Sequence, residues 1–557
     1  MILTEQPHKE SIGQGKSLMN SLLLRGITWP FAGMGIHPEE KEMKKKILFS
    51  LAAISLTVCL CLLPAYSVEV KDVFRFASAE PLTGNWDTTS HTILAQIGIE
   101  NHIFDKLFAE PCGVDDPSKL IPALAVSYSR VDPLTLEFKL RKDVKFHDGT
   151  PFNAKDVKAT LDYYSDPQKP GFGWLPGKLV STVVDDYTVH VKTEKPVGSL
   201  IYSLGLVSIM SDEDIASGKI KDRPNGTGPW KYTKQEGDTT ILSANENYWA
   251  GPPKLKELHW IYVPNSSVRL FGLLSGEYDA IERVESEHIG SIEENKNTSV
   301  IKAASVENKW LIFRCQKPPF NDVRVRQAIS HAVDREGIVH ILGAAGNAVG
   351  AHIPPAKFGY VETPNNIKYD PAKAKKLLAE AGFEDMSKFP TLEYVTSTGF
   401  YPKTKEYAEY IAASLGTIGI KVNLKVLETA PWLESLYNPE AGHMIDTGWC
   451  SGTPEPDQII RTIFHRSTKR MTFIDDEEIS NSLDKEQAAV NLDERKKIFQ
   501  EETLPLLMEK VPALPLFTSV FIWGYRNDVK NFKGWPSNFF YLKDIEEPYG
   551  KNDVYKE

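Results

Sequence analysis

The residues that could carry chemistry form no recognisable catalytic or metal-binding motif in this chain of 557 residues. Residues 171–179 are rich in glycine, but their spacing is wrong for a phosphate loop, and Leu179 stands where a Ser or Thr would bind magnesium. The 13 histidines are scattered, and the motifs G-x-S-x-G and H-E-x-x-H are missing. The carboxylates at 475–478 fit a solvated helix start, where they favour the helix dipole. We therefore predict no catalysis, no metal and no cofactor, with a secreted hydrolase assembled from distant residues as the alternative.

The composition is that of a soluble globular protein, and it excludes some partners. Hydrophobic residues make up 41% and charged residues 25% of the chain, and the length predicts two or three structural domains. The net charge is -10 and the isoelectric point is near 5.8. Nucleic acid and anionic membrane each require a basic face, so neither is expected as the main partner.

The N-terminal region has the pattern of a secretory signal peptide. Lysines at 44–46 precede an apolar run at 47–63, and the small residues Ala65 and Ser67 follow. This pattern predicts export, with residues 43–67 as a signal peptide cleaved after Ser67. A membrane anchor is the alternative, although the run is short for a span. Residues 1–42 are then an extension upstream of the true start of translation.

Three cysteines, Cys112, Cys315 and Cys450, remain after the predicted cleavage. Three cysteines do not form a disulfide framework, and domains of the expected size do not need one. We therefore expect no disulfide, although the spacing leaves a single bridge open.

The elements that follow alternate between strands and helices. Residues 134–140 alternate apolar and polar side chains, as in a half-buried strand, and a helix is expected at 154–164. The apolar run at 200–210 is expected to be a buried core element. Further strands are expected at 310–313 and 422–426, and further helices at 322–339, 370–382 and 403–415. This succession predicts an α/β protein with mixed or parallel sheets covered by helices.

Four segments of the sequence carry a family resemblance. Residues 124–163 read LAVSYSRVDPLTLEFKLRKDVKFHDGTPFNAKDVKATLDY, and residues 225–232 read NGTGPWKY. Residues 317–339 read KPPFNDVRVRQAISHAVDREGIV, and residues 369–383 read YDPAKAKKLLAEAGF. In this order they closely resemble the bacterial family 5 solute-binding proteins of ABC importers, which are the oligopeptide, dipeptide and nickel binders. The segments themselves are expected to be scaffold, since they supply turns, caps and an amphipathic helix.

The resemblance implies a type II-like periplasmic binding protein fold. Two lobes would be joined by a hinge, and a third domain would be added to one of them. Closure of the lobes would hide the solute between them. Lobe I would comprise residues 68–112, 212–306 and 521–557, the extra domain 113–211, and lobe II 307–520.

The resemblance also implies where the ligand lies. In oligopeptide binders the segment that matches 448–457 lines the cleft, and its tryptophan walls a side-chain pocket. Trp449 is therefore the leading candidate, and Trp432 and Trp310 resemble further aromatic walls, although each could be a packed core residue. The other predicted ligand contacts are Cys450, Glu455, Asp457, Ser90 and His91, of which the last two could equally belong to a surface turn.

One position departs from the peptide binders of this family. They commonly place an Asp at the position of Gly452, where it offsets the charge of the peptide's α-ammonium, which is costly to bury unpaired. In this chain Glu455 or Asp457 would have to supply that charge. The nickel binders carry a His in this segment, but none occurs at 448–457, so nickel is not expected.

These observations together predict a periplasmic, monomeric solute-binding component of an ABC importer. Its expected partners are a small-molecule ligand and the membrane permease subunits with their ATPases. A peptide is the expected ligand. The alternative is the same role for a non-peptide solute, such as an opine-like conjugate, an oligosaccharide or a blocked peptide.

Overall fold

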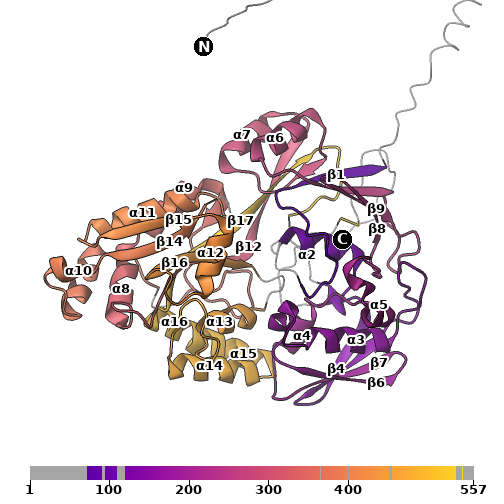
Figure 1. Cartoon of the computed structure of the whole chain (residues 1–557), viewed down its shortest axis with the longest axis horizontal. Helices are drawn as coiled ribbons and strands as arrows, with labels where there is room; N and C mark the ends of the chain where they lie inside the picture. The colour runs from indigo at the N-terminus through magenta and orange to yellow at the C-terminus, as the bar shows by residue number, and fades with distance from the viewer. Residues whose placement is uncertain are drawn as a thin grey trace, which may run out of the picture. The chain divides into compact units, whose positions relative to one another are not determined.

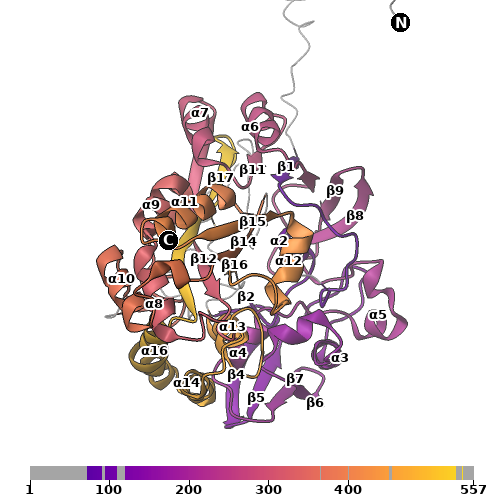
Figure 2. The same ribbon diagram turned by 60° about the vertical axis from the view of Figure 1, so that its left-hand side comes forward.

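The computed structural model describes residues 72–90, 94–109, 120–363, 366–398, 401–450, 455–534 and 542–543. The predicted extension and signal peptide lie outside these ranges, as do His91, Cys112 and Gly452. The described residues from 72 onward belong to one compact unit (Figures 1 and 2). No helix in the described ranges is long and apolar enough to cross a membrane.

A mixed, eleven-stranded sheet runs through this unit (Figure 1). Most of its strand pairs are antiparallel, but β1 (Val73–Ser78) pairs in parallel with β10 (Glu257–Tyr262) and β11 (Ala280–Ile281), and β14 (Leu392–Ser397) pairs in parallel with β15 (Val422–Leu427) and β16 (Met444–Cys450). The mixed pairing confirms the predicted architecture. The strands follow the order β15 (Val422–Leu427), β14 (Leu392–Ser397), β16 (Met444–Cys450), β12 (Thr298–Phe313), β17 (Ala513–Arg526), β11 (Ala280–Ile281), β1 (Val73–Ser78), β10 (Glu257–Tyr262), β9 (Thr239–Ala244) and β8 (Trp230–Glu236), with β13 (Gly346–Asn347) added on β17.

The two longest strands, β12 and β17, connect the halves of this sheet. They are 16 and 14 residues long and pair antiparallel with each other. Their register shifts between Ala304 and Asn308, and β12 pairs with β16 only from Glu307 onward. The predicted boundary between lobe I and lobe II, at residues 306 and 307, lies within this register shift. The division into lobes stays a prediction.

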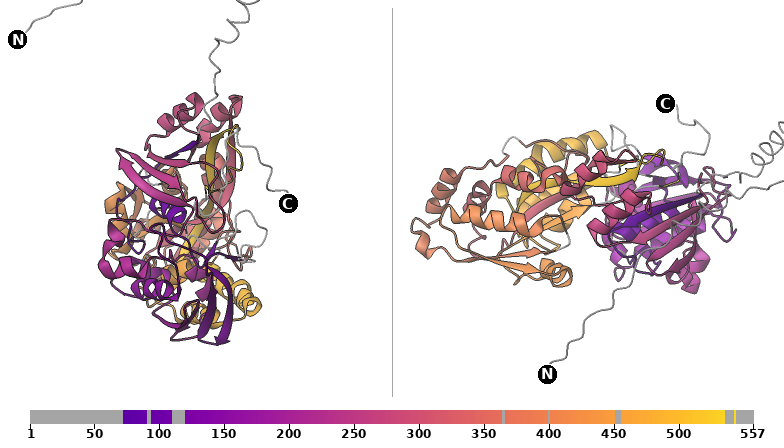
Figure 3. Two further views of the ribbon diagram at one scale, coloured as in Figure 1. Left: turned by 90° about the vertical axis from the view of Figure 1, so that its right-hand side faces the viewer. Right: turned by 90° about the horizontal axis from the view of Figure 1, so that it is seen from above.

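Helices of the C-terminal half pack around the strands of that half (Figure 3). The apolar stripe of residues 322–339 predicts a single helix, but the structure has two helices there. Val333 adopts an extended backbone, and the Asp334 side chain accepts the Gly337 N–H and caps the second helix. The helices are α8 (Val323–Ala332), α9 (Arg335–Leu342), α10 (Pro371–Glu380), α11 (Thr404–Gly416), α12 (Thr429–Tyr437), α13 (Asp457–Phe464), α14 (Glu477–Ala488), α15 (Leu492–Ile498) and α16 (Leu504–Lys510).

A separate four-stranded antiparallel sheet lies in the region of the predicted extra domain. Its order is β4 (Ala125–Asp132), β5 (Thr135–Leu140), β7 (Thr188–Thr193) and β6 (Leu179–Asp185). The helix α3 (Ala154–Tyr164) begins with a capping box in which Asn153 and Asp156 satisfy each other's backbone N–H groups. The strand and helix predicted at 134–140 and 154–164 are therefore confirmed.

The remaining elements complete the N-terminal half. Residues 200–210 are buried throughout, as predicted, and begin with the short helix α4 (Leu200–Leu204). Side chains of the four-stranded sheet share one apolar core with β1 and β10. The other elements are α2 (Leu94–Ile103), β2 (Phe108–Ala109), β3 (Ile121–Pro122), α5 (Asp212–Ser217), α6 (Ser266–Ser275) and α7 (Ile289–Glu294).

Candidate functional site

Two of the predicted tryptophans line one small cavity. In the antiparallel register of β12 and β16, Asn308 lies opposite Trp449, and Trp310 lies opposite Thr447. Opposed residues project from the same face of a sheet, as do residues two apart on a strand, so Trp310 and Trp449 share one face. The cavity has a volume of about 10 Å³, close to the minimum for a single water molecule. Its other apolar lining residues are Val306, Ile353, Pro354, Pro456 and Ile459.

Asn308, His352 and Lys357 also line this cavity, and hydrogen bonds to backbone carbonyls hold Asn308, His352 and the indole of Trp310. Trp310 Nε1 donates to the carbonyl of His352 at 3.2 Å, and Asn308 Nδ2 donates to the carbonyl of Ala351 at 3.2 Å. The His352 Nε2 atom lies 2.9 Å from the carbonyl of Ala513, and because a carbonyl can only accept, this nitrogen carries the proton. Burial lowers the pKa of His352 to about 4, so its ring is neutral. The lining is therefore mostly apolar, and the ring of His352 adds no charge to it.

The opposite face of β12 carries charged residues that the sequence analysis did not select. Lys309 is 1% exposed, and its ammonium lies 3.2 Å from Glu307 Oε1 and over the ring of Tyr401. Burial lowers the pKa of Lys309 to about 8, although Glu307 acts against the shift. Tyr401 Oη donates to the carbonyl of Gly448 at 2.9 Å. Charged residues that alternate with Trp310 on a buried strand are the signal that could have revealed this cluster.

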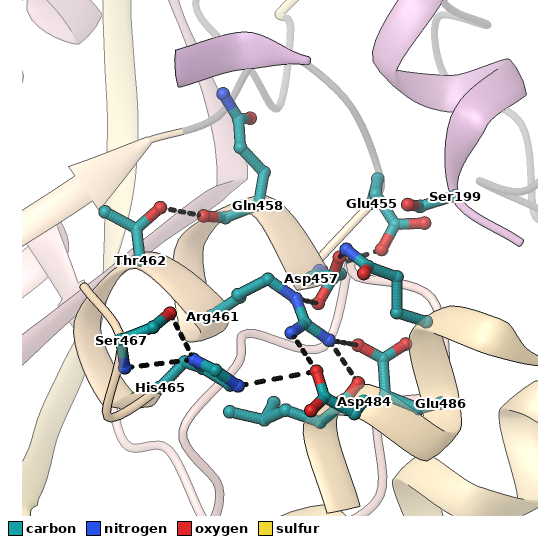
Figure 4. A network of polar contacts seen from close by, with 12 residues as sticks. Ser199, Glu455, Asp457, Gln458, Arg461, Thr462, His465, Ser467, Asp484 and Glu486 are labelled. Carbon is teal, nitrogen blue, oxygen red and sulfur yellow. Dashed lines mark hydrogen bonds and ion pairs between the residues drawn. The ribbon is translucent and has the colours of Figure 1, made fainter. Parts of the chain in front are cut away.

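Glu455 and Asp457 each form an ion pair with an arginine, and Figure 4 shows the pair of Asp457 with Arg461. The Glu455 carboxylate accepts two hydrogen bonds of 2.6 Å from the guanidinium of Arg495. Asp457 accepts from Arg461 Nε at 2.9 Å and from Gln487 Nε2 at 3.0 Å. Burial alone would raise the pKa of Asp457, but the charges of Arg461 and Arg495 and the hydrogen bonds from Glu486 and Gln487 together outweigh burial and lower that pKa to about 2. Both carboxylates are thus engaged by arginines.

The remaining predicted residues lie apart from the cavity lining. Trp432 is 1% exposed, donates from Nε1 to the carbonyl of Asp446 at 3.3 Å, and meets the ring of Tyr401 edge-on. Cys450 is the last residue of β16 and is half-buried. Ser90 closes a turn in which its N–H donates to the carbonyl of Asp87 at 2.9 Å.

Comparison with known proteins identifies the family. The profile of the bacterial extracellular solute-binding proteins, family 5 Middle, matches residues 119–470, and the chain belongs to this family. The family consists of non-catalytic solute-binding proteins that serve ABC importers. No metal-holding group of His, Cys, Asp or Glu side chains occurs within the described ranges.

Similar proteins are named for different solutes. The heme-binding protein A of Haemophilus influenzae is 28% identical over 468 residues, covering 78% of this chain and 83% of that protein. The glutathione-binding protein GsiB of Salmonella typhi is 27% identical over 518 residues, covering 89% and 98%.

Solved structures show the same fold. The Helicobacter pylori periplasmic binding protein DppA, in complex with the peptide STSA, superposes with a TM-score of 0.73 at 25% identity, covering 85% of this chain and 98% of that one. MoaA from A. tumefacien R10, in complex with mannopinic acid, superposes with a TM-score of 0.71 at 26% identity, covering 85% and 99%. These likenesses confirm the predicted class of fold.

Proposed function

We propose that this chain is the periplasmic solute-binding component of an ABC importer for peptide uptake, and that its solute places an apolar group between Trp310 and Trp449. The shared face of these two tryptophans, closed by Pro456 and Ile459, is the observation that carries the proposal. Rigid aromatic and proline side chains lose little conformational entropy on binding, which suits them to wall a solute pocket.

The cavity is too small for a peptide, so binding requires the lobes to move. A volume of about 10 Å³ holds no more than one water molecule. Strands β12 and β17 cross between the predicted lobes, with the register shift beside Asn308. A β-bulge weakens pairing locally, so bending at this place would open the cavity without unfolding either half of the sheet.

A non-peptide or N-blocked solute in the same role is the second candidate. It is favoured by the engagement of Glu455 and Asp457 with Arg495 and Arg461, because neither carboxylate is then available to a peptide ammonium. The relatives named for heme and glutathione, and the structure that holds mannopinic acid, indicate that this family serves several solute chemistries.

Native mass spectrometry of the protein isolated from its own periplasm tests both candidates. We expect a tightly held small molecule, in a one-to-one complex, whose mass identifies it as a peptide or another solute. A mature N-terminus at Val68 in the same sample would establish the predicted export. Turnover of the bound molecule to a product would overturn the proposal in favour of a hydrolase, and an N-terminus within residues 1–42 on a cytoplasmic protein would refute export.

A further inference from the structure

A segment next to the four-stranded sheet is seated on the helices beside the pocket. The N–H of Gly198, just before α4, donates to the carbonyl of Gln487 at 2.7 Å. A Cβ atom at Gly198 would lie only 2.1 Å from the carbonyl oxygen of Ala489 and 2.9 Å from Cδ of Arg495. Any larger residue must therefore displace the segment or the helices, so the close approach requires glycine.

Arg495 lies between this segment and Glu455. Its guanidinium binds Glu455 through two hydrogen bonds of 2.6 Å and Glu486 Oε2 at 2.9 and 3.0 Å. All three side chains are at most 1% exposed. The guanidinium also lies 5.4 Å from the ring of Phe358, which is 6.4 Å from the ring of Tyr202 on α4. The segment at 198–202 thus reaches Arg495 through both its backbone and an aromatic ring.

The same network holds one wall of the pocket. Glu455 and Asp457 flank Pro456, and Pro456 and Ile459 line the cavity. Arg495 fixes the first of these carboxylates, and Gln487 Nε2 donates to the second at 3.0 Å. Gln487 therefore contacts Gly198 through its backbone and the pocket wall through its side chain.

We propose that Arg495 and Gln487 are positioning residues that couple the seating of residues 198–202 to the placement of the pocket wall at 455–459. When residues 198–202 contact the helices, this contact fixes the position of the Gln487 carbonyl and of the Arg495 side chain. These two residues then hold the wall at 455–459 against the tryptophans. Solute bound to the wall then stabilises the contact of residues 198–202 with Gln487 and Arg495. That contact in turn raises the affinity for solute, because such coupling is reciprocal. This inference rests on the proposed function, since the wall matters only if the cavity takes solute.

Hydrogen exchange of the solute-free protein tests the coupling. Gly198→Ala displaces the segment, and Gly290→Ala on α7 is the control because a Cβ atom there meets nothing within 4 Å. We expect the amides of Asp457, Ile459 and Ile460 to exchange roughly tenfold faster in Gly198→Ala and unchanged in the control. A change confined to residues 196–204 would overturn the proposal.

A second variant tests the link without disturbing the close approach. Gln487→Leu removes the side-chain bond to Asp457 but keeps the backbone carbonyl that accepts from Gly198. We expect the amides at 457–460 to lose the same protection while the Gly198 amide stays protected, and we expect the double variant to add nothing further. Effects that add independently would contradict the coupling. The exchange experiment contains no solute, so a negative result would refute the coupling and leave the proposed function intact. Conversely, native mass spectrometry that found no bound solute would count against the proposed function and leave the exchange result unchanged.

Discussion

Replacing Arg495 with methionine would distinguish a scaffold role of Glu455 from a role in binding solute. Methionine fills much of the same space, but Glu455 would lose both guanidinium contacts of 2.6 Å while its side chain stays 1% exposed. Glu486 would lose the same partner at 2.9 Å. Burial, followed by the charge of Asp457, already raises the pKa of Glu486 well above its usual value. The variant therefore removes the cation that faces both buried carboxylates.

The free energy of unfolding that Arg495→Met loses equals the free energy of protonating a buried glutamate that no longer faces the guanidinium. An ordinary glutamate carboxyl has a pKa of about 4.3, and each pH unit above the pKa adds about 1.36 kcal/mol to the free energy of protonating it. At about pH 7 protonation therefore costs roughly 3.7 kcal/mol. That value agrees with the ~3–5 kcal/mol lost when a buried ion pair loses one partner. At about pH 5 the same proton costs only about 1 kcal/mol. The loss of stability should therefore shrink as the pH falls from 7 to 5.

Urea unfolding at both pH values measures the free energy of unfolding. Arg466→Met is the control, because Arg466 is 46% exposed and its partner Asp475 is 86% exposed. Exposed pairs contribute about 0–1 kcal/mol, so the control should lose little at either pH. If Arg495→Met and the control lost equal amounts, or if the loss did not change with pH, the buried-pair reasoning would be wrong.

Three further predictions address the cleft. Because burial lowers the pKa of Lys309 to about 8, the folded protein releases this proton before the unfolded chain does. Stability should thus gain up to about 3 kcal/mol from this group as the pH rises from about 8 to 10.5, and urea unfolding of Lys309→Met should lack the gain. Trp449→Ala should lower the affinity for the solute identified by mass spectrometry at least tenfold, as measured by calorimetry, because it removes an apolar wall worth about 1.5–3 kcal/mol. Tyr437 is exposed, so Tyr437→Ala should leave the affinity unchanged. Gly452→Asp should improve binding of free-amine dipeptides relative to their N-acetylated forms, and equal titrations of both proteins would refute the missing-anchor hypothesis.

Local patterns predicted some elements well and others only in part. The strand at 134–140 and the helix at 154–164 follow from apolar alternation and from the Asn153 cap, which are both local. The strand predicted at 310–313 is the end of a 16-residue strand. Its earlier residues include Lys302 and are stabilised by β17, more than two hundred residues away, which no local pattern reveals.

The candidate site was predicted unevenly for a similar reason. The resemblance singled out Trp310 and Trp449, but their common face depends on the register of β12 against β16. Glu455 and Asp457 were predicted as ligand contacts from their place in the cleft segment. The partner of Asp457 is Arg461, four residues later on the same helix, and that spacing could have indicated an ion pair. The partner of Glu455 is Arg495, whose proximity follows only from the packing of α13 against α14 and of α14 against α15.

The engaged acids also bear on which solute the pocket prefers. An ammonium group that entered beside Pro456 would have to compete with Arg495 or Arg461 for their carboxylates, and both guanidinium groups stay charged at any physiological pH. Separating either buried pair would cost about 3–5 kcal/mol, which corresponds to more than about a hundredfold in affinity. A solute that brings an apolar or neutral polar group avoids this cost. We therefore expect N-blocked peptides and non-peptide solutes to bind this pocket more tightly than free-amine peptides of the same size, unless an acidic residue is restored at position 452.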